Sequence, residues 1–397
     1  MKQILFITSA NLASNPRLVK ELKLALANGY QAGVVQFYIN NWSDGMTDEL
    51  KLQFAGVKFT ELSAIRKPFL PWFISTVAQK IFSFLPVEIM NTQMLSVVAG
   101  KRSLLLLSQL KKMNQKVDWV IAHNPAAFYP AYWYAKKTGA SLGIDVEDYH
   151  PGETDNVKAA SSMRKLMQQI LPFANYCSYA APLIAAEVKK DIPQMNNPQL
   201  TILNGFDAEE FIQPTDHKSS ALQLVWFSQN IDAGRGLEHV IPVVNELFPA
   251  VELHLIGNLK QEFANLHLQN RTGIVIHAPM PQEKLHAFLA KFDVGLATDI
   301  PVNRNRELAL TNKIIAYTQA GLYIAAMHTL AQDDFLKESD LQHELMENDA
   351  LSIRKAFINL YQKKKNAELY KQEQFQKGQS YAWQKLSHQL VSIWENV

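Results

Sequence analysis

The sequence lacks several features that mark whole classes of protein. It contains one cysteine, Cys177, which cannot form an internal disulfide and which we interpret as a small hydrophobic residue of the core in a reducing compartment. Its 39 Lys and Arg residues nearly balance its 37 Asp and Glu residues, so no binding of nucleic acid is expected. There is no uninterrupted apolar run of about 18 residues, the length that a membrane-spanning helix needs. The opening MKQILFITSA is too short and too strand-like for a signal peptide, so we expect a cytoplasmic protein.

The loop after the first strand-like segment lacks a glycine-rich fingerprint for a nicotinamide cofactor. QILFITS is followed by a polar stretch without glycine, and this argues against a dehydrogenase. The same stretch contains Asn15 and Arg17, which are candidates to line an acceptor site or to bind phosphate.

What the sequence does have is an alternation of strand-like apolar runs and helix-period segments over almost its whole length. This alternation predicts βαβ units and parallel sheets, and 397 residues exceed what one core usually supports, so two α/β domains are expected. A polar, Pro-containing segment at 207–221 interrupts the pattern and is interpreted as a linker between a first domain, 1–206, and a second, 222–378. Ligands of such sheets bind at the carboxyl ends of the strands.

Two further segments carry their own expectations. In the last one, 379–397, helical spacing places on one face Trp383, Leu386, Leu390 and Ile393. The other, Lys67–Met90, is rich in Phe and Pro, has only three charges and is expected to be broken at Pro68, Pro71 and Pro86. Its helices either lie on a membrane surface or pack as a lid on their own domain. We favour the lid because the aromatic residues do not follow one clean face and basic residues are few.

A strand–loop–helix unit in the second half predicts phosphate binding. DVGLAT (Asp293–Thr298) reads as a strand, and LTNKIIAYTQAG (Leu310–Gly321) reads as a helix capped by Thr311 and ended by glycine. A helix N-terminus at the end of a strand, together with the ammonium of Lys313, attracts an anion.

Segments spread over most of the chain resemble the GT-B glycosyltransferases, most closely the nucleotide-sugar-dependent group called glycosyltransferase family 4. The first half contributes ASNPRLVKELKLALANGYQAGVV, DWVIAHNPAAFYPAYWYAKKTGASLGIDVEDYHP, ILPFANYCSYAAPLIAAEV and LTILNGFDAEEF. The second half contributes LVWFSQNIDAGRGLEHVI, VELHLIG, DVGLA and LTNKIIAYTQAG. The resemblance implies an α/β fold of two Rossmann-like domains facing across a cleft, acceptor domain first, with the terminal helix crossing back to the first domain.

In the second domain the resemblance implies a site for the donor diphosphate. Negative charge develops on the leaving phosphate, and cations and helix N-termini placed there lower the barrier. Arg235 and Lys313 are the candidate catalytic cations, and Arg235 stands where the family usually has lysine followed by glycine. Further candidates for donor binding are Gln229, Gly234, Asn305, Arg306, Thr311 and Asn312.

The chain departs from the family pattern at two donor-site positions. Gln229 stands where the family often has a second arginine. Ala316 stands where the family usually has a glutamate that holds the nucleotide ribose. Glu307, nine residues earlier, either substitutes for that glutamate or has no such role.

In the first domain the resemblance places His123 at the end of a strand, facing the donor sugar or the reaction centre. The alternative is a histidine satisfied by backbone groups. The following strand ends in DVED, which includes Glu147 and Asp148. An acidic pair after a strand can hold a divalent ion in another glycosyltransferase fold, but the two-sheet pattern does not match that fold. We therefore interpret Glu147 and Asp148 as contacts to an acceptor hydroxyl or as structural caps, and expect no metal site.

Together the patterns predict a glycosyltransferase that moves a sugar from a UDP-, GDP- or dTDP-linked donor to a glycan or lipid-linked acceptor, with no cofactor. The resemblance favours retention of the anomeric configuration and bacterial cell-surface polysaccharide synthesis. Two alternatives stay open: a nucleotide-sugar epimerase of the same fold, and a degenerate GT-B protein that only binds nucleotide or a partner. The expected location is the cytoplasm, either free or peripheral on the inner face of the plasma membrane through 67–90.

Overall fold

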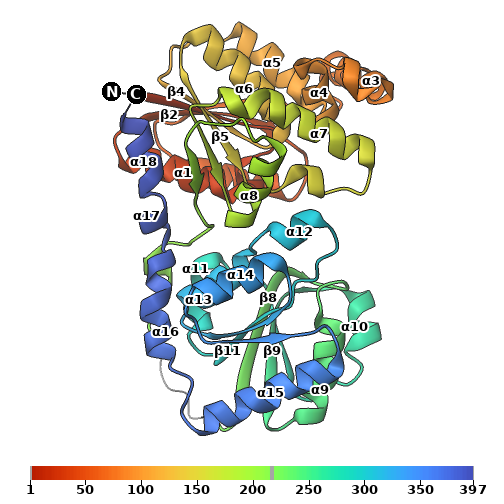
Figure 1. The fold of residues 1–397 in the computed structure, drawn as a ribbon, viewed down its shortest axis with the longest axis vertical. Coiled ribbons are helices and arrows are strands. Elements are labelled where there is room, and N and C mark those ends of the chain that lie inside the picture. The colour runs from red at the N-terminus through yellow and green to blue at the C-terminus, as the bar shows by residue number, and fades with distance from the viewer. Residues whose placement is uncertain (1, 215–218, 397) are drawn as a thin grey trace. The chain divides into compact units, whose positions relative to one another are not determined.

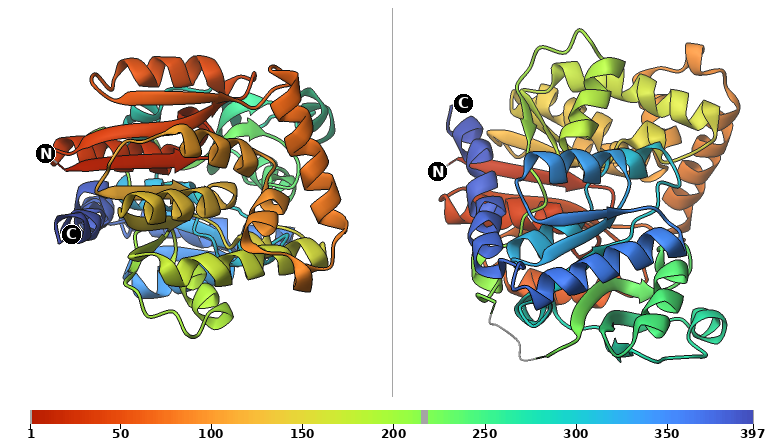
Figure 2. Two further views of the ribbon diagram at one scale, coloured as in Figure 1. Left: turned by 90° about the horizontal axis from the view of Figure 1, so that it is seen from above. Right: turned by 60° about the horizontal axis from the view of Figure 1, so that its bottom comes forward.

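The computed structural model describes residues 2–214 and 219–396, which form two compact units (Figure 1). The first unit runs to Ile202 and includes the segment from Ser387 onward, and the second is Leu203–Leu386. Each unit contains one parallel sheet with helices packed around it (Figure 2), as the alternation in the sequence predicts.

The first unit has a seven-stranded sheet in the order β3-β2-β1-β4-β5-β6-β7, with every described pair parallel. Its strands are β1 (Gln3–Thr8), β2 (Gln31–Tyr38), β3 (Lys58–Ser63), β4 (Trp119–His123), β5 (Ser141–Val146), β6 (Tyr176–Tyr179) and β7 (Gln199–Thr201). Its helices are α1 (Pro16–Ala27), α2 (Ser43–Leu52), α3 (Phe69–Phe84), α4 (Thr92–Ala99), α5 (Arg102–Lys112), α6 (Pro125–Thr138), α7 (Val157–Ile170), α8 (Pro182–Asp191) and α18 (His388–Glu395). The central strands β1 and β4 are continuous apolar runs because both faces of a parallel sheet are covered by helices.

The second unit has a six-stranded parallel sheet in the order β10-β9-β8-β11-β12-β13. Its strands are β8 (Leu222–Ile231), β9 (Val251–Leu259), β10 (Ile274–His277), β11 (Val294–Ala297), β12 (Tyr323–Met327) and β13 (His343–Met346). Its helices are α9 (Leu237–Leu247), α10 (Gln261–His267), α11 (Gln282–Leu289), α12 (Arg304–Leu308), α13 (Asn312–Gln319), α14 (Leu330–Glu338), α15 (Ala350–Lys365), α16 (Lys371–Gly378) and α17 (Trp383–Leu386).

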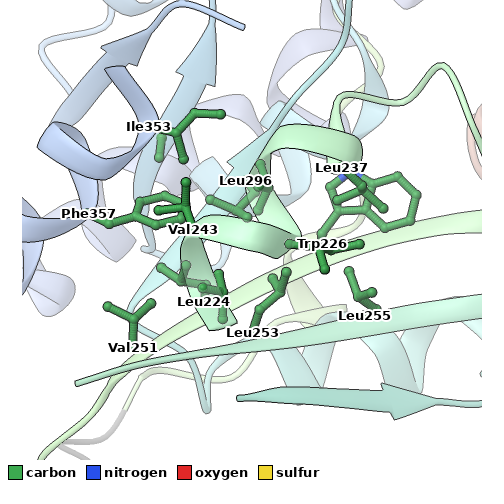
Figure 3. Close-up of a cluster of buried hydrophobic side chains, with 14 of the residues drawn as sticks. Leu224, Trp226, Leu237, Val243, Val251, Leu253, Leu255, Leu296, Ile353 and Phe357 are labelled. Carbon is green, nitrogen blue, oxygen red and sulfur yellow. The ribbon is translucent and has the colours of Figure 1, made fainter. Parts of the chain in front are cut away.

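The core of the second unit lies between its sheet and two helices, α9 and α15 (Figure 3). Trp226 from β8 is fully buried, and Phe357 from α15 packs into the same cluster. Leu253 and Leu255 alternate along β9 and present their side chains to the same face, as residues two apart on a strand do. This layer holds β8 and β11 in place beneath the loops described below.

The order of strands gives each sheet one point where the winding direction reverses. In the first unit it lies between β1 and β4, and in the second between β8 and β11. Ligands of open parallel sheets bind outside the carboxyl ends of the strands at such a point. The loops that follow these four strands are therefore the first places to look for a site.

The boundaries between the units differ from the predicted ones. Residues 203–206 and 379–386 belong to the second unit rather than to the first. The reason is a set of hydrogen bonds around Phe206, whose backbone N–H donates to Gln319 Oε1 at 2.8 Å and whose carbonyl accepts from the Trp383 N–H at 3.0 Å. The expected linker, 207–221, also begins with ordered contacts to the second unit, since His286 stacks on Phe211. Its residues 215–218 lie outside the described residues.

The terminal segment is not the single helix that its spacing predicts. It divides at Ser387 into α17, in the second unit, and α18, in the first. Leu390 and Trp394 are fully buried in α18, whereas Ile393 is half-buried. The carbonyl of Trp394 accepts from the indole N–H of Trp119 at 3.2 Å, and its own indole donates to the hydroxyl of Tyr176 at 3.1 Å. The two ends of the chain thus lie side by side in the first unit (Figure 1).

Helix α3 occupies most of the Phe- and Pro-rich segment. Pro71 does not break it, because this residue lies in the first turn, where a missing N–H costs no intrahelical bond. One side of α3 packs toward α4 and α5. The opposite side exposes apolar side chains whose helical spacing places them on one face, contrary to the expectation from sequence: Phe69, Leu70, Phe73, Ile74, Val77, Ile81 and Phe84.

Two features of the sequence, its single cysteine and its lack of a long apolar run, can be compared with the structure. Cys177 is fully buried in β6, and this burial raises the pKa of its thiol to about 12, so it is a core residue. Within residues 2–214 and 219–396, no helix is both long enough and apolar enough to span a membrane.

Candidate functional site

The loop after β8 is tied to the loop after β11 by hydrogen bonds through Thr298. The Thr298 hydroxyl donates to the backbone carbonyl of Arg235 at 2.6 Å and accepts from the indole N–H of Trp226 at 3.0 Å. Arg235 therefore has a fixed backbone position at the point where the winding of the sheet reverses. Its side chain is half-buried, and none of the described residues forms a hydrogen bond or an ion pair with the guanidinium. A guanidinium held in this way is available to an anionic ligand.

Two glycines shape the same loop. Gly234 and Gly236 have φ angles of +72° and +76°, which glycine adopts without a steric penalty. A Cβ on Gly236 would lie 2.5 Å from the carbonyl oxygen of Thr298, so the two loops approach too closely for a larger residue. Gly236 is also the N-cap of α9, and its turn directs the chain from Arg235 into that helix.

The N-terminus of α13 presents its first amides without a side-chain cap. Thr311 is the N-cap residue, but its hydroxyl donates to Asp299 Oδ2 at 3.0 Å instead of accepting from a helix N–H. The Lys313 ammonium donates to the other oxygen of Asp299 at 3.0 Å and is nearly buried. The amides of the first turn thus stay available for an anion, whereas the charge of Lys313 is already balanced by a carboxylate.

In the first unit, the strands at the reversal point end in a buried cluster of charged residues. His123 is the last residue of β4, and its register partner on β5 is Asp145. The imidazole Nε2 lies 3.3 Å from Glu21 Oε2, and Nδ1 lies 3.4 Å from Asp145 Oδ2 and 3.6 Å from Glu147 Oε1. The Arg17 Nε lies 3.2 Å from Glu21 Oε1, and an Arg17 terminal nitrogen donates to the carbonyl of Ile202 at 2.6 Å.

The pKa values in this cluster follow from burial and from the charges around each group. Burial alone would lower the pKa of His123, but the nearby Glu21, Asp145 and Glu147 outweigh it and raise the pKa well above its usual value. Burial would raise the pKa of Asp145, but the Arg17 guanidinium and His123 lower it below its usual value. Burial raises the pKa of Glu147, which Asp145 reinforces. These directions favour a protonated His123 beside an ionised Asp145.

Comparison with known proteins identifies the fold. No protein-family model matches the sequence, and no curated protein matches it. Among solved structures, a glycosyltransferase from Rickettsia africae is 13% identical with a TM-score of 0.68, over 100% of this chain and 98% of that one. HepE from Anabaena in complex with UDP is 12% identical with a TM-score of 0.65, over 100% of both chains. TarM from S. aureus is 11% identical with a TM-score of 0.68, over 99% of both chains.

The chain has the GT-B fold. At these identities the likeness concerns the architecture, which confirms the α/β fold with two Rossmann-like units that the sequence predicts. The roles of individual residues must come from this chain itself.

Several predicted donor-side residues of this GT-B chain meet around the reversal point of the second sheet. Arg235, Gly234 and Thr311 belong to the loops and helix start just described. Asn305 is buried and Arg306 exposed in α12, while Gln229 near the end of β8 and Asn312 at the start of α13 are exposed.

The departure at Ala316 and its suggested substitute, Glu307, have clear structural positions. Ala316 is fully buried in α13, so its side chain contributes to the core. Glu307 Oε2 accepts from the backbone N–H of Leu330 at 3.2 Å and therefore helps to cap α14. The alternative in which Glu307 holds a ribose stays a prediction.

In the first unit the structure corrects the environments expected for three residues. His123 is fully buried, so its ring is enclosed by carboxylates and is not presented to solvent. Arg17 is also buried, and its guanidinium lies against the carboxylates of Glu21 and Asp145; its role toward an acceptor or a phosphate stays a prediction. Asn15 caps α1, since its side chain accepts from the Leu18 N–H at 3.1 Å.

Glu147 and Asp148 are both half-buried, and Glu147 Oε1 lies 3.6 Å from His123 Nδ1. The sequence analysis missed Glu21 and Asp299. Glu21 had one available signal, because it lies four residues after Arg17 on the apolar face of an amphipathic helix. A charged pair on a buried face requires partners from elsewhere in the fold.

Proposed function

We propose that this protein is a glycosyltransferase that uses a nucleotide sugar, with the donor diphosphate bound at the reversal point of the second sheet. The observation that carries the proposal is the half-buried Arg235 guanidinium, which has no side-chain partner among the described residues, together with the first turn of α13, whose amides lack a side-chain cap. Both stabilise the negative charge that develops on a leaving diphosphate. HepE, which shares the fold, has been crystallised with UDP-glucose.

The chemistry of the donor step follows from these groups. We propose that the diphosphate leaves without a metal ion at its phosphates, because Arg235 and the α13 amides supply the positive potential. Lys313 contributes less than the sequence suggested, since Asp299 balances its charge. The acceptor is a glycan or lipid-linked molecule of cell-surface polysaccharide synthesis whose hydroxyl contacts Glu147 or Asp148 of the first unit, and transfer retains the anomeric configuration.

A two-stage experiment tests this function. A thermal-shift screen with UDP, GDP and dTDP should identify one base that raises the melting temperature. The purified protein should then hydrolyse or transfer the sugar from at least one donor with that base. A full donor panel with plausible acceptors that gives no stabilisation and no turnover would refute the proposal.

The same experiment separates two alternatives. An epimerised sugar nucleotide formed without any acceptor would identify an epimerase of the same fold. Stabilisation by a nucleoside diphosphate without turnover of any donor would identify a protein that binds nucleotide only.

We further propose that the exposed apolar face of α3 rests on an anionic membrane surface. Seven large apolar side chains of this helix are exposed, and Phe84 and Leu70 are 75% and 64% exposed. Exposed basic residues adjoin the face, namely Arg66, Lys67 and Lys80. Apolar side chains enter the interface while cations contact anionic headgroups, as in amphipathic helices that bind membranes peripherally.

Vesicle sedimentation tests this contact. The wild-type chain should bind vesicles of phosphatidylglycerol and phosphatidylcholine more tightly than vesicles of phosphatidylcholine alone, and salt should weaken the difference. Phe73→Asp with Ile81→Asp should reduce binding by about tenfold or more, since each buried apolar side chain contributes roughly 1.5–3 kcal/mol.

The matched control is Leu351→Asp, which places the same charge on an exposed apolar residue of α15 in the second unit. It should leave vesicle binding unchanged. Equal binding by the α3 variant and the control would refute the membrane contact.

A further inference from the structure

We propose that His123, Asp145 and Glu147 bind one divalent transition-metal ion, best matched by zinc, at the carboxyl ends of β4 and β5. Each residue offers one ligand atom, and these three atoms lie within 4.8 Å of one another. The site belongs entirely to the first unit and is separate from the donor diphosphate site proposed above.

The two distances from His123 Nδ1 to the carboxylate oxygens match coordination better than hydrogen bonding. His123 Nδ1 lies 3.4 Å from Asp145 Oδ2 and 3.6 Å from Glu147 Oε1. Hydrogen bonds between charged groups are shorter, at about 2.7–2.9 Å. Two ligands of a tetrahedral zinc ion with bonds of about 2.0–2.1 Å lie about 3.3–3.5 Å apart.

All three atoms are buried, and among the described residues none of them has a hydrogen-bond partner. His123 and Asp145 are almost completely buried, so water does not satisfy them from the protein surface. Buried polar atoms without partners are costly, and a set of them aimed at one point indicates a ligand that they share. The side chain of Glu147 is 24% exposed, so an ion from solvent can reach the space between the three ligand atoms.

The surrounding residues orient these ligands as the outer residues of metal sites do. The second imidazole nitrogen, Nε2, lies 3.3 Å from Glu21 Oε2, so a carboxylate adjoins the side of the ring opposite Nδ1. The Ser178 hydroxyl donates to Asp145 Oδ1 at 2.6 Å, and Arg17 lies 3.4 Å from the same oxygen. The other oxygen of Asp145 is thereby turned toward His123.

The balance of charge also favours a divalent ion. The carboxylates of Glu21, Asp145 and Glu147 face one guanidinium, that of Arg17, so a neutral His123 leaves the cluster with two negative charges in excess. Burying excess charge is unfavourable, and one divalent cation removes it. Two protons, on His123 and Glu147, would also remove it. Metal and protons compete for the same atoms.

Zinc titration of the full-length chain tests the proposal. After treatment with a chelator, the wild type should bind one zinc ion per chain in isothermal titration calorimetry, and the affinity should fall as the pH is lowered because protons displace the ion. Glu147→Gln should abolish this binding while preserving side-chain size, and circular dichroism should confirm that the variant is folded. His123→Ala should abolish it as well.

A second variant distinguishes orientation from direct ligation. Glu21→Gln should weaken zinc binding by about 10–100-fold without changing its stoichiometry, because it alters the partner of Nε2 and removes no ligand. Glu153→Gln, which changes an exposed carboxylate of the same unit, is the control and should bind as the wild type does.

The result that overturns the proposal is a wild-type chain that takes up neither zinc nor manganese at neutral pH. Unchanged binding by Glu147→Gln or His123→Ala would overturn it equally and would leave a network closed by protons. None of these measurements uses a nucleotide or a sugar, so failure of the glycosyltransferase proposal and failure of the metal proposal are distinguishable.

Discussion

Arg235→Ala is expected to reduce kcat/KM for sugar transfer by about 10²–10³-fold, the loss typical of removing one preorganised group that stabilises a developing anion. Arg235 is half-buried in the loop just before α9, and its guanidinium has no side-chain partner among the described residues. Its removal therefore takes positive charge from the diphosphate and leaves the packing of the second unit unchanged.

The measurement is steady-state kinetics with the donor found in the thermal-shift screen, together with the melting temperature of each variant. Arg235→Lys should keep part of the activity, because it preserves the charge but loses the two-pronged geometry. Lys355→Ala, which removes an exposed cation from α15, should match the wild type in both respects. An Arg235→Ala enzyme with more than half of the wild-type kcat/KM would exclude this arginine from catalysis.

Trp394→Ala is expected to destabilise the first unit by about 3–5 kcal/mol, the usual cost of truncating a buried tryptophan. Trp394 is fully buried, meets the ring of Tyr30 edge to face at 5.9 Å, and donates its indole N–H to Tyr176. The truncation leaves a cavity and removes the partner of a buried hydroxyl, so α18 should lose its anchor on the first sheet.

Hydrogen exchange measures this effect in each unit separately, which matters because a chain of two units does not unfold in one step. Protection should fall in β4 and β5 and should stay unchanged in β9 and β11. His388→Ala, an exposed change on the same helix, should alter stability by no more than about 0.5 kcal/mol. Equal protection of β4 in wild type and Trp394→Ala would show that α18 does not stabilise the first unit.

Much of the fold could be predicted because it depends on local pattern. The apolar run QILFITS became β1, the helix expected from Pro16 became α1, and DVGLAT became β11. These assignments need only the periods of strands and helices and the chemistry of their ends. The terminal helix was predicted less well, because its division at Ser387 depends on which unit each half packs against.

The candidate sites show the same limit more sharply. Thr311 was expected to cap α13, and its position was correct, but its hydroxyl binds Asp299 from another loop. The exposed apolar face of α3 was not predicted, because a break was expected at Pro71. The helix instead begins at Phe69 and continues through Pro71. The hydrogen-bond partner of Thr311 and the exposed face of α3 both depend on residues from other segments of the chain.

The sequence by itself determined two parallel α/β sheets, the loop that carries Arg235 and the helix that begins after Thr311, since each follows from residues close together in the chain. Only the tertiary structure decided what His123 does. The strand order places β1 beside β4 and β4 beside β5, although about 110 residues separate β1 from β4. This order brings Glu21 from α1, His123 and Asp145 together in one buried cluster, where their mutual charges, rather than the identity of any one residue, set their chemistry.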